Sequence, residues 1–125
     1  KIINNTEDNT GMTLTLALSY GGKQEIFKAV KEISEKVKNE IINLDNFDDS
    51  IINDHLYTKN LPDVDLLIRT SGEQRISNFL LWQIAYAELY FTETYWPDFS
   101  EEDFTDAIIE YQKRERRFGK TSKQL

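Results

Sequence analysis

The sequence predicts an α/β fold in which a parallel sheet is flanked by helices. Residues 12–19 alternate between apolar and polar side chains, as in a strand with one apolar face. Apolar residues at helical spacing follow over 26–37, and a short apolar stretch typical of a buried strand comes later, at 64–68. Strands that alternate with helices along a chain favour a parallel sheet covered on both faces.

The first predicted unit is a strand, a glycine turn and a helix. The strand covers Met12–Ser19, and the Gly21-Gly22 pair then interrupts the alternation. Five apolar residues share one face of the following helix, while lysine and glutamate occupy the opposite face. These five residues are Ile26, Ala29, Val30, Ile33 and Val37.

A second, shorter unit follows in the middle of the chain. A helix is predicted to begin with Ser50 as its N-cap and to continue as far as Leu56. Residues 61–63, which read Leu-Pro-Asp, then predict a turn. The strand at 64–68 follows this turn directly.

A long apolar run covers residues 78–91, where Gln83 and Glu88 are the main interruptions. Such a run predicts a buried helix, because a helix that is apolar on all sides has no face for water. The β-forming residues at 89–92 leave a second interpretation open, in which the helix ends near Tyr86 and a strand follows.

The last predicted helix begins with Ser100 as its N-cap, and Asp103 lies in its acidic first turn. Phe104, Ile108 and Tyr111 continue one face of this helix.

Composition excludes several classes of protein. The chain has 125 residues, which is near the usual size of one domain, and no cysteine, so it has neither disulfides nor thiolate metal sites. Its net charge of -7 disfavours general binding to nucleic acid. No apolar run reaches the roughly 20 residues of a membrane span, and no signal peptide is visible, so a cytoplasmic protein is expected. Six basic residues gather in 113–123, where they could simply solvate the end of the last helix.

The candidate binding residues follow the predicted strands. In open α/β sheets ligands bind beyond the carboxyl ends of the strands, where segments 19–23 and 69–77 lie. Arg69 and Arg75 carry guanidinium groups that match phosphate oxygens two at a time, and Ser77 precedes the predicted buried helix. These residues predict a site for a phosphate or diphosphate.

A simpler interpretation of the same residues is also open. Arg69 and Arg75 could pair with Asp65 and Glu73 on the surface, and Ser77 could be an ordinary N-cap.

Glu88 is unusual because it is the only acid between Glu73 and Glu93. An acid within an apolar run either lies at the edge of its helix or pairs with a cation or metal. A continuous helix would separate Glu88 from Ser77 by about 16 Å. Both residues could therefore reach one diphosphate–metal cluster only if the helix ends early or a partner subunit contributes.

Several motifs together resemble the cis-prenyltransferase family. The most specific one runs from Asp65 to Gln83 and contains Arg69-Thr70-Ser71-Gly72-Glu73-Gln74-Arg75-Ile76-Ser77-Asn78. The other matching stretches, in the same order as in the family, are 10–14, 19–26, 85–88, 96–99 and 116–119.

The resemblance implies the fold of this family and a transferase activity. Such enzymes condense isopentenyl diphosphate onto an allylic diphosphate, usually farnesyl diphosphate, and make each new double bond cis. The product is a long-chain polyprenyl diphosphate, undecaprenyl in bacterial members, which carries sugars for cell wall biogenesis. The resemblance also implies Mg²⁺, a homodimer, and a cytoplasmic enzyme with peripheral membrane contact through its lipid product.

Site residues are carried over position by position. Arg69, Arg75 and Ser77, together with Ile76, match the residues that bind isopentenyl diphosphate. Glu88 matches a glutamate associated with Mg²⁺. Arg117 and Gly119 match an Arg-x-Gly motif that reaches the diphosphate site across the dimer interface.

Two departures from the family pattern affect these expectations. Ser19 and Lys23 stand where the family commonly has asparagine and arginine, so the amide and the bidentate fork are lost. The aspartate block that holds Mg²⁺ in the family is absent from the sequence. We therefore expect residues 1–125 to be the C-terminal portion of a single cis-prenyltransferase domain, with no catalytic residue of its own and inactive alone. The alternatives are a non-catalytic prenyltransferase-like subunit and another diphosphate-binding α/β module.

Overall fold

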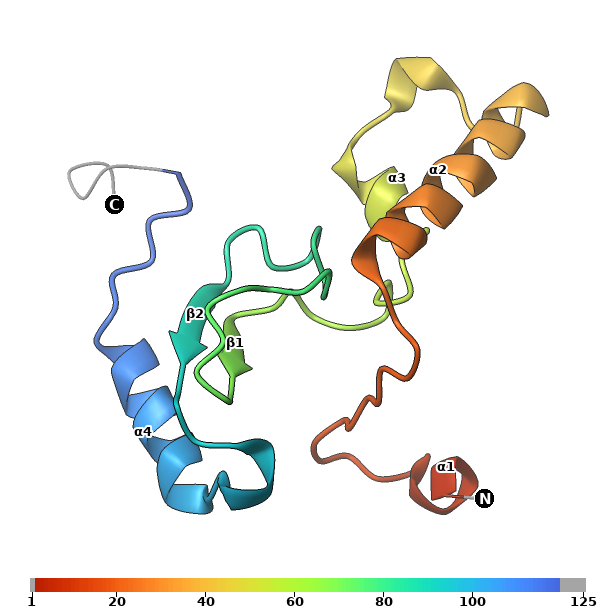
Figure 1. The fold of residues 1–125 in the computed structure, drawn as a ribbon. Helices are drawn as coiled ribbons and strands as arrows, with labels where there is room; N and C mark the ends of the chain where they lie inside the picture. Colours follow the sequence, from red (N-terminus) through yellow and green to blue (C-terminus); the bar gives the residue numbers. More distant parts are fainter. Residues whose placement is uncertain (1, 120–125) are drawn as a thin grey trace.

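The two strands of the sheet lie near the middle of the fold, between the helices α2 and α4 (Figure 1). The computed structural model describes residues 2–119. Its helices are α1 (Ile2–Thr6), α2 (Gly22–Lys38), α3 (Asp49–Asn53) and α4 (Glu101–Gln112), and its strands are β1 (Leu66–Arg69) and β2 (Glu88–Phe91). Two short 3₁₀ turns cover Leu44–Asn46 and Trp96–Asp98.

The sheet is parallel, as predicted. Glu88 at the start of β2 lies opposite Leu66, and Phe91 at its end lies opposite Arg69. The first strand begins two residues later than the predicted range of 64–68. Because the strands run in one direction, their carboxyl ends lie at the same end of the sheet. The segment that begins with Thr70 follows β1 at this end.

Helix α2 confirms the predicted amphipathic helix, although Val30 on its predicted apolar face is 56% exposed. Ala29 and Ile33 are buried on the same face as Glu25, while the lysines of the helix are exposed to solvent. This face packs against α3 and the chain that follows it. Figure 1 shows α2 and α3 side by side on the opposite side of the sheet from α4.

Helix α3 differs from its predicted bounds. Asp48, not Ser50, is the N-cap, and its Oδ1 accepts a hydrogen bond from the Ser50 amide at 3.0 Å. The hydrogen bonds from Ser50 lower the pKa of Asp48, so this cap is ionised and favours the helix N-terminus. The helix ends at Asn53, and Leu56 is buried although it lies beyond the helix.

The predicted strand at 12–19 is wrong, because the structure has no regular secondary structure there. Leu14, Leu16 and Leu18 point into solvent and are 75%, 72% and 83% exposed. A strand needs neighbours for its backbone N–H and C=O groups, and in residues 2–119 the two strands pair only with each other. The alternating pattern therefore lacks the sheet partner that would make it a strand.

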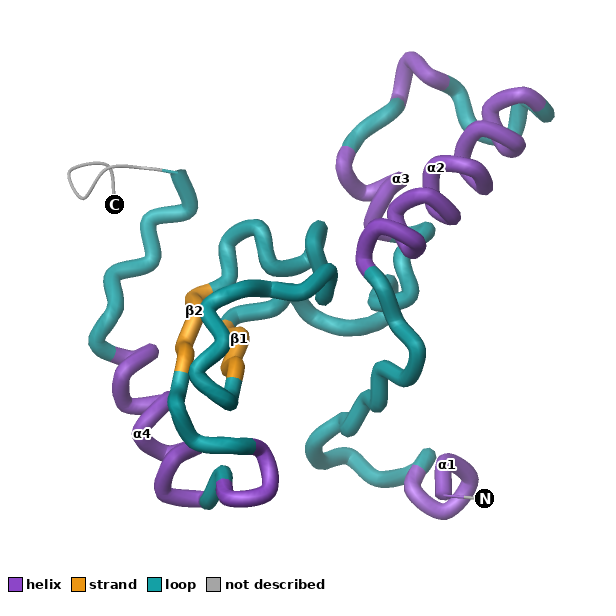
Figure 2. Tube along the Cα trace, viewed as in Figure 1, coloured by secondary structure: helices purple, strands orange, loops and turns teal. Residues whose placement is uncertain are grey.

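The predicted buried helix at 78–91 is also wrong in its first part. Ser77, Asn78 and Leu80 have positive φ angles of 51°, 63° and 45°. The left-handed region cannot continue a right-handed helix, so residues 78–87 form a series of turns. Figure 2 shows this connection between β1 and β2 as loop. The interpretation in which a strand follows is confirmed by β2.

Helix α4 confirms Ser100 as an N-cap. The Asp103 amide donates to Ser100 Oγ at 3.2 Å and the Ser100 amide donates to Asp103 Oδ2 at 2.8 Å, which completes a capping box. The helix packs on β2, with Ala107 fully buried, whereas Phe104 on the predicted apolar face is half exposed.

The fold leaves much apolar surface uncovered. Its accessible surface is 10376 Å², whereas a compact monomer of this mass exposes about 6,900 Å². The buried hydrophobic residues are Ala29, Ile33, Leu56, Leu67, Ile84 and Ala107.

Candidate functional site

A cavity of about 430 Å³ lies beside β1 and its C-terminal end, where ligands bind in α/β sheets. Arg69, Arg75 and Ile76 all line it, so the structure brings three of the predicted site residues together. The hydroxyl residues Thr70 and Ser71 also line the cavity. One carboxylate, that of Glu73, lines the cavity too, but the two cations outnumber it. Cationic, hydroxyl and apolar groups together suit a ligand that joins a phosphate to a hydrocarbon.

The loop after β1, which lines this cavity through Thr70 and Ser71, depends on Gly72. Its φ of 69° lies in the left-handed region, and a Cβ at this position would lie 2.4 Å from Glu93 Oε2. The Ser71 amide donates to Thr94 O at 2.9 Å and the Gly72 amide donates to Thr92 O at 2.8 Å. These hydrogen bonds therefore fasten the loop after β1 to the chain that follows β2. They keep Arg69 and Arg75 together at the carboxyl end of the sheet.

The two arginines differ in their partners. Arg75 forms an ion pair with Glu73, as the simpler interpretation of the sequence expected, and both side chains are largely exposed. Within residues 2–119, Arg69 makes no ion pair, because Asp65 pairs with Arg116 instead. Among the described residues, Arg69 thus offers a guanidinium with no carboxylate partner, and Arg75 offers one whose carboxylate an incoming anion could replace.

Ser77 does not line the cavity, and no helix begins after it. The prediction that a helix N-terminus attracts an anion at Ser77 is therefore wrong. The left-handed conformation of Ser77 and Asn78 turns the chain toward α2 instead.

Asn78 joins the two segments that the sequence placed beyond the strand ends. Its backbone oxygen accepts from the Gly22 amide at 2.7 Å, and its Oδ1 accepts from the Lys23 amide at 2.8 Å. Its Nδ2 donates to Gln24 Oε1 at 3.0 Å. The amides at the start of α2 are thus occupied by Asn78, so they are not open to a ligand in this structure.

Glu25 is a buried residue that the sequence reasoning missed. Its side chain is 1% exposed, and it accepts hydrogen bonds from Tyr20 Oη at 2.5 Å, the Tyr57 amide at 2.7 Å and Gln83 Nε2 at 3.0 Å. Burial of the phenol, together with its hydrogen bond to Glu25, raises the pKa of Tyr20 above 10.0. The available signal was spacing, since Glu25 precedes Ala29 by four residues on the buried face of α2.

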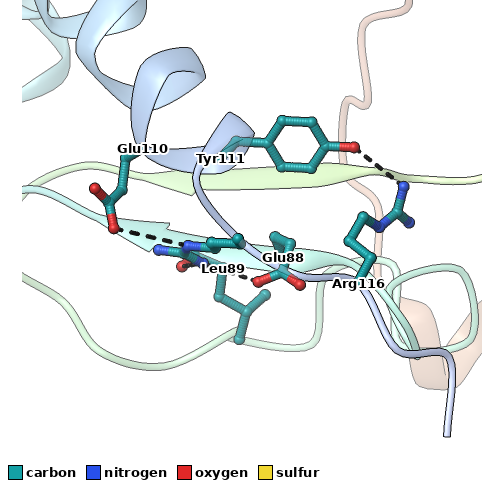
Figure 3. A network of polar contacts seen from close by, with 6 residues as sticks. Glu88, Leu89, Glu110, Tyr111 and Arg116 are labelled. Atoms are coloured by element: carbon teal, nitrogen blue, oxygen red, sulfur yellow. Dashed lines mark hydrogen bonds and ion pairs between the residues drawn. The ribbon is translucent and has the colours of Figure 1, made fainter. Parts of the chain in front are cut away.

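Glu88 lies away from the cavity, at the opposite end of the sheet. It faces Leu66 in the parallel register, three residues before the level of Arg69, or about 10 Å along the strands. Its Oε2 accepts a hydrogen bond from Arg114 Nη1 at 3.0 Å. Figure 3 shows Glu88 and Leu89 at the start of β2 near Glu110 of α4.

Glu88 does not form a Mg²⁺ site with its neighbours. No group of three or more histidine, aspartate, glutamate or cysteine side chains that could hold a metal occurs in residues 2–119. A guanidinium on the carboxylate also repels a divalent cation. The residues of the described chain therefore do not fit Mg²⁺ by themselves.

Arg117 and Gly119 also lie apart from the cavity. The neighbouring Arg116 binds Asp65, just before β1, at 2.5 Å, and this hydrogen bond raises the pKa of Arg116. Arg117 pairs locally with Glu115 at 3.0 Å, and a Cβ on Gly119 would lie 4.0 Å from Tyr86 Oη. The C-terminal motif thus approaches the end of the sheet where the strands begin.

A larger cavity of about 710 Å³ lies between the chain before β1 and residues 80–86. Three carboxylates, from Asp49, Asp63 and Asp65, line it and outnumber its two cations, Lys59 and Arg116. Their charge disfavours a diphosphate, so the smaller cavity is the candidate anion site.

The family model described as "Putative undecaprenyl diphosphate synthase" matches residues 1–119. The chain belongs to this family. A curated relative from Haemophilus influenzae, named ditrans,polycis-undecaprenyl-diphosphate synthase ((2E,6E)-farnesyl-diphosphate specific), is 58% identical over 121 residues. That alignment covers 97% of this chain and 51% of the relative. An isoprenyl transferase from Listeria innocua is 56% identical over 119 residues, which are 95% of this chain and 47% of the relative.

Solved structures of the family are also similar. Lavandulyl diphosphate synthase from Lavandula x intermedia, in complex with dimethylallyl diphosphate, superposes with a TM-score of 0.88 and 42% identity. A probable undecaprenyl diphosphate synthase from Campylobacter jejuni has a TM-score of 0.74 and 36% identity. Each comparison covers 94% of this chain, and 50% and 52% of the respective structures.

These findings confirm the resemblance to cis-prenyltransferases and the α/β fold with a parallel sheet. The chain spans about half the length of the curated relatives that it matches. In the described residues, no helix is long and apolar enough to cross a membrane.

Proposed function

We propose that this chain forms part of a cis-prenyltransferase that condenses isopentenyl diphosphate onto an allylic diphosphate. The starter is farnesyl diphosphate and the product is undecaprenyl diphosphate, a lipid carrier. The names of the bacterial relatives support this substrate and product, and the lavandulyl diphosphate synthase structure holds an allylic diphosphate. The chain is proposed to be a portion of one such domain, since it spans about half the length of its curated relatives.

One observation carries the proposal: Arg69 and Arg75 line the same cavity at the carboxyl end of β1. A diphosphate carries several negative charges, and two guanidinium groups match its oxygens through bidentate hydrogen bonds. Ile76 and Phe79 supply an apolar wall for the short isopentenyl chain. Ser77 lies next to this wall and completes the set of residues proposed for isopentenyl diphosphate.

The proposed reaction forms a carbon–carbon bond between the isopentenyl double bond and C1 of the allylic substrate. The allylic C–O bond breaks, diphosphate leaves with its electron pair, and a proton is lost from the isopentenyl unit. In this reaction Arg69 and Arg75 bind and orient the isopentenyl diphosphate. Holding two reactants in line is a large part of catalysis, because it removes the entropy of their encounter.

The Mg²⁺ implied by the resemblance requires ligands from outside residues 2–119. Glu88 would be free to join such ligands only after Arg114 releases its carboxylate.

A homodimer accounts for the place of Arg117 and Gly119. Both lie near the start of the strands, whereas the proposed anion cavity lies beside the carboxyl end of β1. In the proposed homodimer, Arg117 of one copy serves the anion cavity of the other copy.

Isothermal titration with isopentenyl diphosphate tests the proposal. Arg75→Ala is expected to weaken binding by about tenfold or more, because a hydrogen bond to a charged group contributes about 1.5–3 kcal/mol. Lys31→Ala removes an exposed cation on α2 and serves as the control, with unchanged affinity. Equal affinities for the wild type and Arg75→Ala would contradict the proposed ligand role.

A further inference from the structure

The chain after α4 passes the end of the sheet where both strands begin. Residues 115–117 have no helix or strand structure, and alternate side chains of 114–117 have different partners. Arg114 and Arg116 point to the sheet and are 29% and 24% exposed. Glu115 and Arg117 are 47% and 55% exposed and pair with each other at 3.0 Å.

Arg114 holds the start of β2. Its Nη1 donates to Glu88 Oε2 at 3.0 Å and to the backbone oxygen of Leu89 at 2.9 Å. Glu110 of α4 lies 4.0 Å from Arg114 Nε, so a second carboxylate supports the same guanidinium. Arg114 thus joins Glu110, in the last turn of α4, to the first two residues of β2.

Arg116 holds the neighbouring strand. Its Nη1 donates to Asp65 Oδ1 at 2.5 Å and to Tyr111 Oη at 3.1 Å. Its guanidinium also lies 4.5 Å from the centre of the Phe118 ring, which is a cation–π distance. Figure 3 shows Arg116 reaching Tyr111 of α4.

We propose that Arg114 and Arg116 are positioning residues that fasten residues 113–119 across the first residues of both strands and thereby present Arg117 to a diphosphate. This inference rests on the proposed function of Arg117. The basic residues of this segment then have two roles. Arg114 and Arg116 pair with carboxylates of the fold and hold the segment in place, whereas Arg117 binds the diphosphate. Glu88 is, on this account, the anchor of the C-terminal segment.

Amide hydrogen exchange of residues 113–119, followed by mass spectrometry on the full chain, tests the fastening. Arg114→Ala and Arg116→Ala are expected to speed exchange in this segment by about fivefold or more, because each loses charge-assisted hydrogen bonds. Lys113→Ala, an exposed neighbour, is expected to leave exchange unchanged. Exchange in α2 reports whether each variant is folded.

A charge swap provides a second variant. Combining Glu88→Arg with Arg114→Glu is expected to restore part of the protection that either single change removes. Unchanged exchange in both alanine variants would overturn the proposal.

Titration with isopentenyl diphosphate tests whether the fastening acts through Arg117. Arg116→Ala and Arg117→Ala are each expected to weaken binding, and Arg117→Ala is expected to leave exchange unchanged. In the Arg117→Ala background, Arg116→Ala is expected to have no further effect, because it acts through the missing side chain. An additional loss in the double variant would overturn the positioning role. Normal binding by Arg117→Ala would instead refute the proposed function of Arg117, while the exchange result still decides the fastening.

Discussion

Replacing Glu25 by alanine is expected to lower the free energy of unfolding by about 3 kcal/mol. The carboxylate is 1% exposed and accepts three hydrogen bonds, from Tyr20 Oη, the Tyr57 amide and Gln83 Nε2. Each hydrogen bond to a charged group contributes about 1.5–3 kcal/mol. The loss is smaller than the full sum, because Gln83 Nε2 keeps a second partner, Thr58 Oγ1, at 3.0 Å.

Glutamine at this position separates the hydrogen bonds from packing. Glu25→Gln keeps the shape of the side chain, but either orientation of its amide turns an N–H₂ group toward donors that the carboxylate accepted. Its expected loss is about half of the alanine loss, or about 1.5 kcal/mol. Glu32→Ala is the control on the same helix. Its pair with Lys28, at 3.4 Å on the exposed side of α2, is worth less than about 0.5 kcal/mol.

Equilibrium unfolding in urea, followed by circular dichroism, measures these three losses. The expected order is Glu25→Ala, then Glu25→Gln, then Glu32→Ala. If Glu25→Ala and Glu32→Ala unfold at the same urea concentration, the buried carboxylate does not join the three segments, and the reasoning fails.

Three further perturbations test other parts of the fold. Folding raises the pKa of the Tyr20 phenol, so the protonated phenol stabilises the fold below pH 10.0, and this stability is lost as the pH rises through the pKa of the folded state. Tyr20→Phe is therefore expected to flatten the fall in thermal stability above pH 10.0. An unchanged pH profile would contradict this expectation. Glu73→Gln removes the ion-pair partner of Arg75, so it is expected to tighten binding of isopentenyl diphosphate by about threefold in calorimetry; weaker binding would show that the pair orients the arginine. Leu16→Thr changes a side chain that is 72% exposed and is expected to alter the unfolding free energy by less than about 0.5 kcal/mol. Ile33→Ala in the core is expected to lose about 2–5 kcal/mol in the same urea titration, and similar losses for both would contradict the exposure of Leu16.

Elements whose stability is local could be predicted from the sequence. Helix α2 follows from the spacing of Ala29 and Ile33, because helical periodicity decides which face is buried wherever the helix packs. The start of α4 follows from Ser100 and Asp103, since a capping box is made within four residues. Such features need no information about the rest of the chain.

Elements that depend on distant partners could not be predicted in the same way. The alternation at 12–19 is a strand pattern, but a strand forms only when another segment supplies its hydrogen bonds. The apolar run at 78–87 is held in turns by contacts of Asn78 with Gly22 and Lys23, which are more than 50 residues away. Hydrophobic pattern alone cannot show these contacts.

The separation of Arg69 and Glu88 depends both on local structure and on the pairing of distant segments. A continuous helix from Ser77 would place Glu88 about 16 Å away, but residues 78–87 form turns instead. The two ends of the candidate site nevertheless remain apart, because the parallel register sets Glu88 opposite Leu66 while Arg69 ends its strand. Within one chain, the anion cavity and the carboxylate with its C-terminal arginines therefore lie at opposite ends of a four-residue sheet. In the proposed homodimer, the C-terminal segment that contacts Glu88 and Asp65 through Arg114 and Arg116 is the part of this chain proposed to reach the cavity of the second copy.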